Sequence, residues 1–449
     1  MRPAQTVAFS LPTPLCTASS YASFPPRICA DNRELYTSTR AHDGFAAEIL
    51  LAQRQNGFNS YHPVVIPRCR IAERWASSGA WQLPGLMQRL QAPLTAKRSR
   101  GRSFMYAELG RPESLPDSDL DAHQTDLVTL EPKEFSSKIL SQGTAEGDSH
   151  YYYYTTQVGA LEGGQLLRSA PEWEQLVPEA GHGWGSMDPY LSVWIGGAGS
   201  TTQMHYDVQH NVFVQVYGTK RFWLHPPAEM TNLHVFPDAH PRARKSQINF
   251  DRVDAERFPF HRRLRTPWCA TLHEGDALYI PAFWFHHVEA VTPCVSLNVF
   301  SESRLKMAAA RALMIPPPIA PGRLEDGSTI ALFLAALCDI LPKIGVEPAV
   351  ALDEVVISRF KPLMSLQGPQ QADIPFQHTD SVERRHQDYT RHTQDLVEAF
   401  QAMDNEVEGE HGPGVKDIVV AHLLEMWALR TFGAHEVARC LAWCSSNVK

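Results

Sequence analysis

The chain has 449 residues, of which 43% are hydrophobic, so it can bury a large core. Its net charge of −8 and pI of about 6.2 exclude a global electrostatic attraction to nucleic acid. The eight cysteines include no Cys-x-x-Cys pair, so the sequence indicates neither a structural zinc site nor an oxidising compartment.

Residues 1–45 are predicted to be a disordered or targeting tail. The first thirty are rich in Ser, Thr, Ala and Pro, and they contain Arg2 and Arg27 but no acidic residue. This composition is typical of an organelle transit peptide and equally of a disordered tail. The predicted location is therefore the cytoplasm or nucleus, with organelle import as the alternative.

Residues 46–135 are predicted to form an α/β flank of a catalytic domain. A strand is expected at His62–Ile66, a helix within Trp75–Leu90 and an alternating strand at Arg102–Leu109. The basic residues Lys97–Arg102 predict a solvated loop. A further helix opens at Glu131–Phe135 and ends near Ser141.

Residues 136–303 are predicted to form a β core. Short strands separated by Gly and Pro are typical of a sandwich or barrel, here a double-stranded β-helix (jelly roll) with flanking helices. The expected strands are Tyr151–Val158, Tyr190–Ile195, His205–Tyr217, Lys220–Leu224, Ala270–Leu272, Ala277–Ile280, Val288–Val291 and Val295–Phe300.

Residues 304–449 have a helical pattern. The expected helices are Leu305–Met314, Ser328–Leu341, Val382–Met403 and Val415–Trp443. No uninterrupted apolar run reaches about 18 residues, so no membrane span is predicted. The longest run, Ile330–Cys338, predicts a buried helix.

The His205-Tyr206-Asp207 segment predicts a metal site. Residues two apart on a strand share a face, so His205 and Asp207 can approach one ion together. Two histidines and one carboxylate are the protein ligands of many iron(II) oxygenases. The remaining coordination positions of the iron stay open for cosubstrate and dioxygen. The third ligand must come from elsewhere, and the segment Gly275–His287 is suited to supply it. His286 and His287 point to different faces, so at most one of them binds.

The same His-x-Asp pattern occurs twice more, at His378–Asp380 and His386–Asp388. Both copies lie in polar sequence that looks helical, where residues two apart do not share a face. Only the copy at His205 lies in β-type sequence.

These segments resemble the Jumonji-C (cupin-like) family of 2-oxoglutarate oxygenases, and within it the asparaginyl hydroxylases that inhibit hypoxia-inducible factor. The likeness covers roughly residues 63–303. Its residues are His205–Arg221, Gly275–Val288, Ser246–Asp251 and Glu256–Pro259.

The resemblance implies a ligand set and a cosubstrate site. By position, iron would be bound by His205, Asp207 and His286. The residues that would contact 2-oxoglutarate are Lys220, Thr202 and Tyr153, with Asn211 and Asn298 beside it.

The residues themselves support Lys220 as the cosubstrate's cation. A buried dicarboxylate needs a cationic partner, and the last core strand, Cys294–Ser301, contains neither Arg nor Lys. On that strand Asn298 shares a face with Ser296 and Phe300, which fits a polar pocket wall.

One departure concerns the substrate. Where the asparaginyl hydroxylases use an Arg-Gln pair to contact the target side chain, this chain has Arg244 and Lys245. Lysine cannot both donate to and accept from an amide, so asparagine as the target is put in doubt.

The resemblance implies oxidation of a protein side chain with dioxygen and 2-oxoglutarate, releasing succinate and CO2. The alternatives are a tRNA-nucleoside hydroxylase or a histone lysine demethylase of the same fold, and a non-catalytic cupin scaffold. A basic groove near the pocket would favour nucleic acid. The C-terminal helices predict a homodimer interface, as in similar enzymes, or an intramolecular cap.

Overall fold

The computed structural model describes residues 62–104, 125–142, 149–177, 190–319, 321–322, 327–364, 386–406 and 412–448. The predicted tail at residues 1–45, the His378–Asp380 motif and most of the predicted strand Arg102–Leu109 lie outside these ranges.

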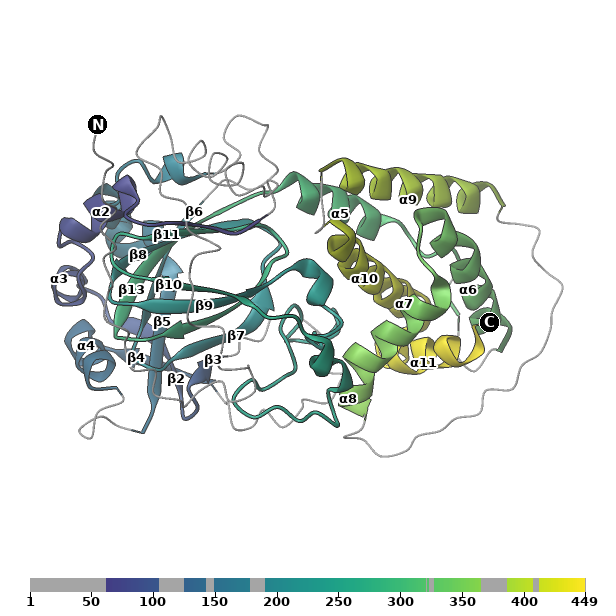
Figure 1. Cartoon of the computed structure of the whole chain (residues 1–449), viewed down its shortest axis with the longest axis horizontal. Coiled ribbons are helices and arrows are strands. Elements are labelled where there is room, and N and C mark those ends of the chain that lie inside the picture. Colours follow the sequence, from purple (N-terminus) through teal and green to yellow (C-terminus); the bar gives the residue numbers. More distant parts are fainter. Residues whose placement is uncertain are drawn as a thin grey trace, which may run out of the picture.

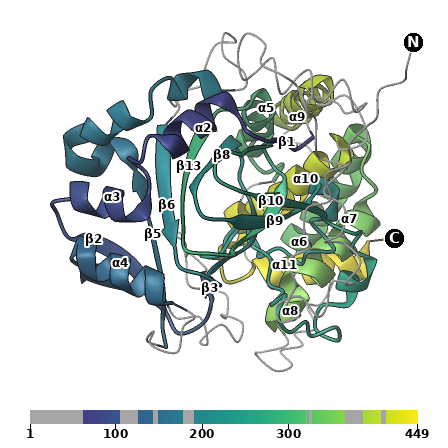
Figure 2. The same ribbon diagram turned by 60° about the vertical axis from the view of Figure 1, so that its left-hand side comes forward.

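Two β-sheets form the core and have the jelly-roll arrangement that the sequence predicts (Figures 1 and 2). The larger sheet has the order β1 (Val64–Ile66), β11 (Ala277–Ile280), β8 (His210–Tyr217), β13 (Cys294–Ser301), β6 (Tyr190–Gly196), β5 (Tyr151–Gln157), β2 (Leu94–Ser99) and β4 (Thr125–Leu130). The smaller has the order β10 (Trp268–Leu272), β9 (Lys220–His225), β12 (Phe285–Ala290), β7 (Thr201–Tyr206) and β3 (Ser103–Phe104). Neighbouring strands are antiparallel except β3 and β7.

The larger sheet separates an apolar face from a mixed face because side chains alternate along its strands. On β13, Val295, Leu297 and Val299 belong to the apolar cluster of the outer face. The intervening Asn298 and Phe300 line a cavity between the sheets. This is the division of faces expected for β13 from its sequence.

Short helices cover the outer face of the larger sheet, as Figures 1 and 2 show. Their buried side chains share one apolar cluster with the strands. They are α2 (Arg70–Ser77), α3 (Leu83–Arg89), α4 (Pro132–Ser141), η3 (Val158–Ser169) and η4 (Trp173–Leu176).

The C-terminal helices pack against the other side of the strands (Figure 1). They are α5 (Arg304–Met314), α6 (Gly327–Ile340), η7 (Leu341–Ile344), α7 (Pro348–Val355), η8 (Val356–Phe360), α8 (Lys361–Met364), α9 (His386–Glu406), α10 (Gly412–Phe432) and α11 (Val437–Asn447). Two short turns, η5 (Pro227–Glu229) and η6 (Pro259–Arg263), lie between β9 and β10. Tyr206 and Phe285 from the strands share one apolar core with Phe333 and Trp427 from the helices, so the two parts bury a common interface.

Within the described residues, one stretch, Gly327–Ile344, is long and apolar enough to span a membrane, with 18 residues and a mean hydropathy of 1.6. Asp339 and Lys343 interrupt this stretch, so it is not an uninterrupted apolar run of the kind that the sequence lacks. The segment comprises α6 and η7. Its side chains Phe333 and Leu337 are fully buried in the shared apolar core, as predicted for a buried helix.

Three predicted elements need correction. The long strand His205–Tyr217 is two strands, because β7 pairs in the smaller sheet and β8 in the larger. The predicted basic loop begins with strand β2, because Lys97 and its neighbours pair with both β4 and β5. The predicted helix Val415–Trp443 is interrupted after Phe432, where Gly433 has a φ of 89°.

Candidate metal and cosubstrate site

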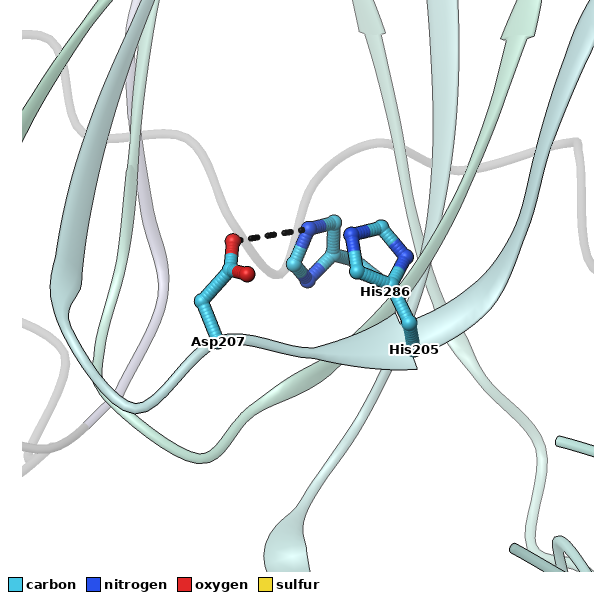
Figure 3. Close-up of side chains that lie close together, drawn as sticks. All are labelled: His205, Asp207 and His286. Carbon is cyan, nitrogen blue, oxygen red and sulfur yellow. Dashed lines mark ion pairs between the residues drawn. The ribbon is translucent and has the colours of Figure 1, made fainter. Parts of the chain in front are cut away.

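The structure brings the three predicted metal ligands together at the end of β7. His286 on β12 pairs directly with His205 on β7. The rings of these histidines are 4.1 Å apart between centroids, and Nε2 of His286 is 3.6 Å from Oδ2 of Asp207 (Figure 3). One ligand atom from each of the three residues lies within 4.8 Å of the others, and no other such group occurs among the described residues.

Backbone carbonyls orient both imidazoles. Nδ1 of His205 donates to the carbonyl of Gln203 at 2.7 Å, and Nδ1 of His286 donates to that of Trp284 at 3.1 Å. With Nδ1 occupied, Nε2 of each ring has its lone pair available for an ion.

His287 lies on the opposite side of β12 from the ligand group. Its ring packs against Trp223 and Phe250, with centroids 5.6 and 6.1 Å away. The alternation of the strand thus separates the adjacent histidines, and His286 is the one that faces Asp207.

The charges at the site favour the protonation states that bind metal. Burial, followed by the neighbouring His286, lowers the pKa of His205 to about 3. Burial opposes ionisation of Asp207, but the adjacent histidines, Arg244 and Lys245 outweigh it and keep the pKa of this carboxyl below its usual value. At neutral pH the site therefore presents neutral imidazole beside a carboxylate.

A cavity of about 220 Å³ contains the ligand group. All ten residues that the sequence singled out line it: Tyr153, Thr202, His205, Asp207, Asn211, Lys220, Arg244, Lys245, His286 and Asn298. The His386–Asp388 motif instead forms the first residues of helix α9.

Lys220 supplies a buried positive charge to this cavity. It is the first residue of β9 and is only 1% exposed. Its Nζ lies 4.9 Å from the ring centre of Phe213 and 5.7 Å from that of Tyr153, and it has no hydrogen-bond partner in the described part of the chain. Because a buried ammonium without a hydrogen bond is costly, this end of the cavity fits an anion.

An amide pair forms another wall. Nδ2 of Asn298 donates to Oδ1 of Asn211 at 3.1 Å, and Oδ1 of Asn298 accepts from the Trp194 indole at 2.5 Å. These contacts join β6, β8 and β13 and fix both amides at the cavity surface.

Arg244 and Lys245 lie beside the predicted metal ligands and not on a free surface loop. The carbonyl of Arg244 accepts from the backbone N–H of Tyr206 at 3.2 Å, and Lys245 forms a β-bridge with His205. Lys245 is only 8% exposed, so its side chain does not extend into solvent. Burial, assisted by the charge of Lys245, lowers the pKa of Lys97 to about 8, which places a further cation nearby.

Sequence reasoning placed Phe300 on the pocket-facing side of its strand but did not identify the rest of the apolar lining. The missed residues are Trp194, Tyr206, Phe213, Phe222 and Val288. Strand alternation could have identified Phe213, because it lies two residues after Asn211.

Three relatives show how far the similarity extends. The chain is 34% identical over 112 residues to Jumonji C domain-containing protein 5 of Drosophila melanogaster, which is 25% of this chain and 27% of that protein. It is 29% identical over 153 residues to the human bifunctional peptidase and (3S)-lysyl hydroxylase JMJD7, covering 30% and 48%. It is 36% identical over 107 residues to tRNA wybutosine-synthesizing protein 5 of Gallus gallus, covering 24% and 31%.

The chain thus spans about a quarter to a half of the length of these relatives. A sequence model of the cupin-like domain matches residues 52–306, which is more than half of the chain and includes every cavity-lining residue. The protein therefore belongs to the cupin-like domain family.

Proposed function

We propose that this protein is an Fe(II)- and 2-oxoglutarate-dependent dioxygenase that hydroxylates a side chain of a protein substrate and releases succinate and CO2. One observation carries the proposal. The two-histidine, one-carboxylate group and the buried Lys220, which lacks a hydrogen bond among the described residues, line the same cavity.

The ligand group fits iron. His205, Asp207 and His286 offer two nitrogen ligands and one oxygen ligand from neighbouring strands. This donor set is typical of non-haem iron oxygenases, whereas structural zinc sites use four protein ligands. Among the described residues, no further histidine, cysteine or acidic side chain lines the cavity as a fourth ligand.

The cavity also fits 2-oxoglutarate. Lys220 would bind the distal carboxylate, and the hydroxyls of Thr202 and Tyr153 would donate to the same group. Bound iron would bring 2-oxoglutarate and dioxygen together and supply the oxidising chemistry that an unactivated C–H bond requires.

The residues around the site position the reactants and exclude water. Trp194, Phe213 and Phe222 are apolar parts of the cavity lining, and the Phe213 ring lies against the Lys220 ammonium. Such an apolar surrounding strengthens the interaction between the ammonium and a carboxylate. The amides of Asn211 and Asn298 keep a polar surface beside the cosubstrate. In this enzyme class such positioning contributes more than acid–base catalysis.

The relatives support oxidation of a protein. JMJD7 is named a lysyl hydroxylase, and an Arabidopsis thaliana relative, 34% identical over 108 residues, is named a lysine-specific demethylase. From the likeness to the asparaginyl hydroxylases, our proposal keeps the contacts of Lys220, Thr202 and Tyr153 to the cosubstrate. The change at Lys245 argues against asparagine as the target.

A second candidate is oxidation of a tRNA nucleoside. Arg244 and Lys245 line the cavity and Lys97 lies near them, so the site has more positive charge than a neutral side chain requires. The similarity to tRNA wybutosine-synthesizing protein 5 points in the same direction. These few cations do not make the protein basic overall, because its net charge is −8. We therefore rank this candidate second.

The test is succinate release by iron-loaded protein in the presence of peptide or RNA pools, with mass spectrometry of the component that gains an oxygen atom. We expect a peptide to gain it. Oxygen gain only in RNA would establish the second candidate.

The comparison variants are Asp207→Ala, which removes a ligand, and His392→Ala, which removes a histidine from helix α9. Release by the wild type and His392→Ala but not by Asp207→Ala is expected. Equal release by all three proteins, or none by the wild type with every pool, would contradict catalysis at this site.

A further inference from the structure

One loop lies between the metal-binding strand and the C-terminal helices. We call this segment, His234–Gln247, the connecting loop. Toward the strand, the backbone N–H of Ser246 donates to the carbonyl of Met204 at 2.8 Å, and that of Tyr206 donates to Arg244 at 3.2 Å. The loop thus extends the edge of β7 and carries both substrate-side cations of the cavity.

The other side of the loop is held by a buried ion pair. Nε of Arg359 on η8 lies 2.8 Å from Oε1 of Glu425 on α10, and the two side chains are 0% and 2% exposed. Arg359 also donates from Nη2 to the carbonyl of Phe236 at 2.9 Å, and Glu425 accepts from the backbone N–H of Asp238 at 2.5 Å. Each member of the pair therefore binds the backbone of the connecting loop directly.

Both ends of the loop have further contacts with η8. Nδ1 of His234 donates to the carbonyl of Ser358 at 2.9 Å, while its Nε2 accepts from the backbone N–H of Phe260 at 3.2 Å. At the other end, Nε2 of Gln247 donates to the carbonyl of Arg359 at 2.9 Å. The loop is thus anchored to one short helix at its first and last residues.

The sequence explains why a carbonyl of η8 is available to accept a hydrogen bond from the connecting loop. Val356–Phe360 is a π-helical turn, a form that is frequent at functional sites. Pro362 follows it and has no backbone N–H, so the carbonyl of Ser358 lacks the donor that an α-helix would supply four residues later. His234 provides the donor in its place.

The loop backbone is strained at two non-glycine residues. The φ angle is +47° at His234 and +66° at Arg244. Such conformations persist only where the surrounding structure holds them. At Arg244 the strain lies within the cavity lining itself.

A side-chain contact links strand β7 to helix α10, which also carries Glu425. The hydroxyl of Tyr206, between the ligands His205 and Asp207, lies 3.1 Å from Nε2 of His422 on α10. The Tyr206 ring is fully buried in the apolar core that the strands share with the C-terminal helices.

We propose that the C-terminal helices are a positioning element of the active site: the Arg359–Glu425 pair holds the connecting loop on β7 and thereby fixes Arg244 and Lys245 beside the metal ligands. A role of Arg244 and Lys245 in catalysis rests on the proposed function. Their position beside the ligand group does not depend on it. Arg359 and Glu425 are positioning residues, since neither lines the cavity.

The test uses the full-length double variant Arg359→Met/Glu425→Leu. Removing both charges avoids an unpaired buried ion, and a buried pair can often be replaced by apolar residues without loss of stability. The two backbone contacts to Phe236 and Asp238 are lost in any case. Hydrogen exchange, resolved by mass spectrometry, is measured together with the melting temperature.

We expect amides of the connecting loop to exchange about tenfold faster, because local opening becomes easier when buried hydrogen bonds are lost. The strands of the larger sheet and the melting temperature should stay as in the wild type. The control is Lys416→Met, which removes a 2.5 Å ion pair with Asp404 between α10 and α9 but none of the loop contacts. Its loop should exchange at the wild-type rate.

Unchanged loop exchange in the double variant would overturn the proposal. So would faster exchange spread evenly over all the C-terminal helices with a lower melting temperature, because the pair would then only stabilise the helices. Exchange does not depend on turnover, so a protein that releases no succinate but shows the local loop response would contradict the proposed function and retain the positioning role.

Discussion

His286 pairs with His205 across the ladder between β12 and β7, and the ladder shifts register immediately afterwards. The pairing places two predicted ligands from segments far apart in sequence on one side of the smaller sheet. Asp207 follows directly after β7, where the chain leaves this sheet for the larger one. The predicted metal site therefore lies at the point where the chain passes between the two sheets.

The first prediction concerns metal affinity. His286→Ala should weaken binding of Co²⁺, used as a spectroscopic substitute for Fe²⁺, by more than about 100-fold, because even residues that only orient ligands contribute 10–100-fold. His392→Ala should bind like the wild type. The measurement is titration followed by visible absorption, and near-normal affinity of His286→Ala would show that this histidine is not a ligand.

The second prediction concerns the cosubstrate. Lys220→Ala should raise the 2-oxoglutarate requirement several-hundred-fold, since losing one partner of a buried charged pair costs about 3–5 kcal/mol. Co²⁺ affinity should change little, because Lys220 is not in the ligand group.

The matched control for this variant is Lys343→Ala, which removes a lysine from an exposed pair with Asp339. Succinate release is measured over a range of 2-oxoglutarate concentrations. A Lys220→Ala requirement equal to that of the control would mean that another residue binds the distal carboxylate.

The sequence predicted the β core and the polar part of the cavity lining. The β core and the inward face of Asn298 depend on alternation within single strands, whereas Thr202, Tyr153, Asn211, Arg244 and Lys245 were implied by the family resemblance. The position of Asn298 opposite Val299 and the separation of His286 from His287 follow from this period alone. The polar residues stand out because polar side chains are unusual at inward positions of apolar strands.

Other features depend on pairing between distant segments, which local pattern does not reveal. Lys97 is in a strand because Tyr153 and Leu127 pair with it on either side. The burial of Lys245 accompanies a bridge to His205, which lies in a different segment of the chain. The boundary between β7 and β8 depends on which sheet each one joins.

The third prediction concerns Lys97, whose pKa burial lowers to about 8. The unfolded chain keeps the usual lysine pKa of about 10.4, so between these values the unfolded state binds more protons and stability rises with pH. Below pH 8 the folded protein bears the full cost of a buried charge. Lys97→Met should therefore stabilise the protein at pH 7, by at most about 3 kcal/mol, and by much less at pH 10.

Urea unfolding at the two pH values measures this difference. Lys133→Met is the matched control, because Lys133 is an exposed lysine of helix α4. A gain from Lys97→Met that is the same at pH 7 and pH 10 would show that the cause is packing and not charge.

The fourth prediction concerns the target residue. By the proposed resemblance, Lys245 occupies the position where the asparaginyl hydroxylases have glutamine. Its burial in the cavity lining keeps its charge near the predicted metal ligands. A buried ammonium favours a carboxylate over a neutral amide. The wild type should therefore hydroxylate asparagine in ankyrin-type peptides weakly or not at all, and an aspartate version of the same peptide about tenfold better, a difference of ~1.4 kcal/mol.

The experiment compares asparagine, aspartate and histidine versions of one peptide with the wild type, Lys245→Gln and the control Lys343→Gln. Glutamine can both donate and accept, so Lys245→Gln should lose the aspartate preference and gain turnover of asparagine. The control should keep the wild-type order, because Lys343 lies in an exposed pair on the C-terminal helices. Efficient asparagine turnover by the wild type, unchanged in Lys245→Gln, would show that this residue does not determine specificity.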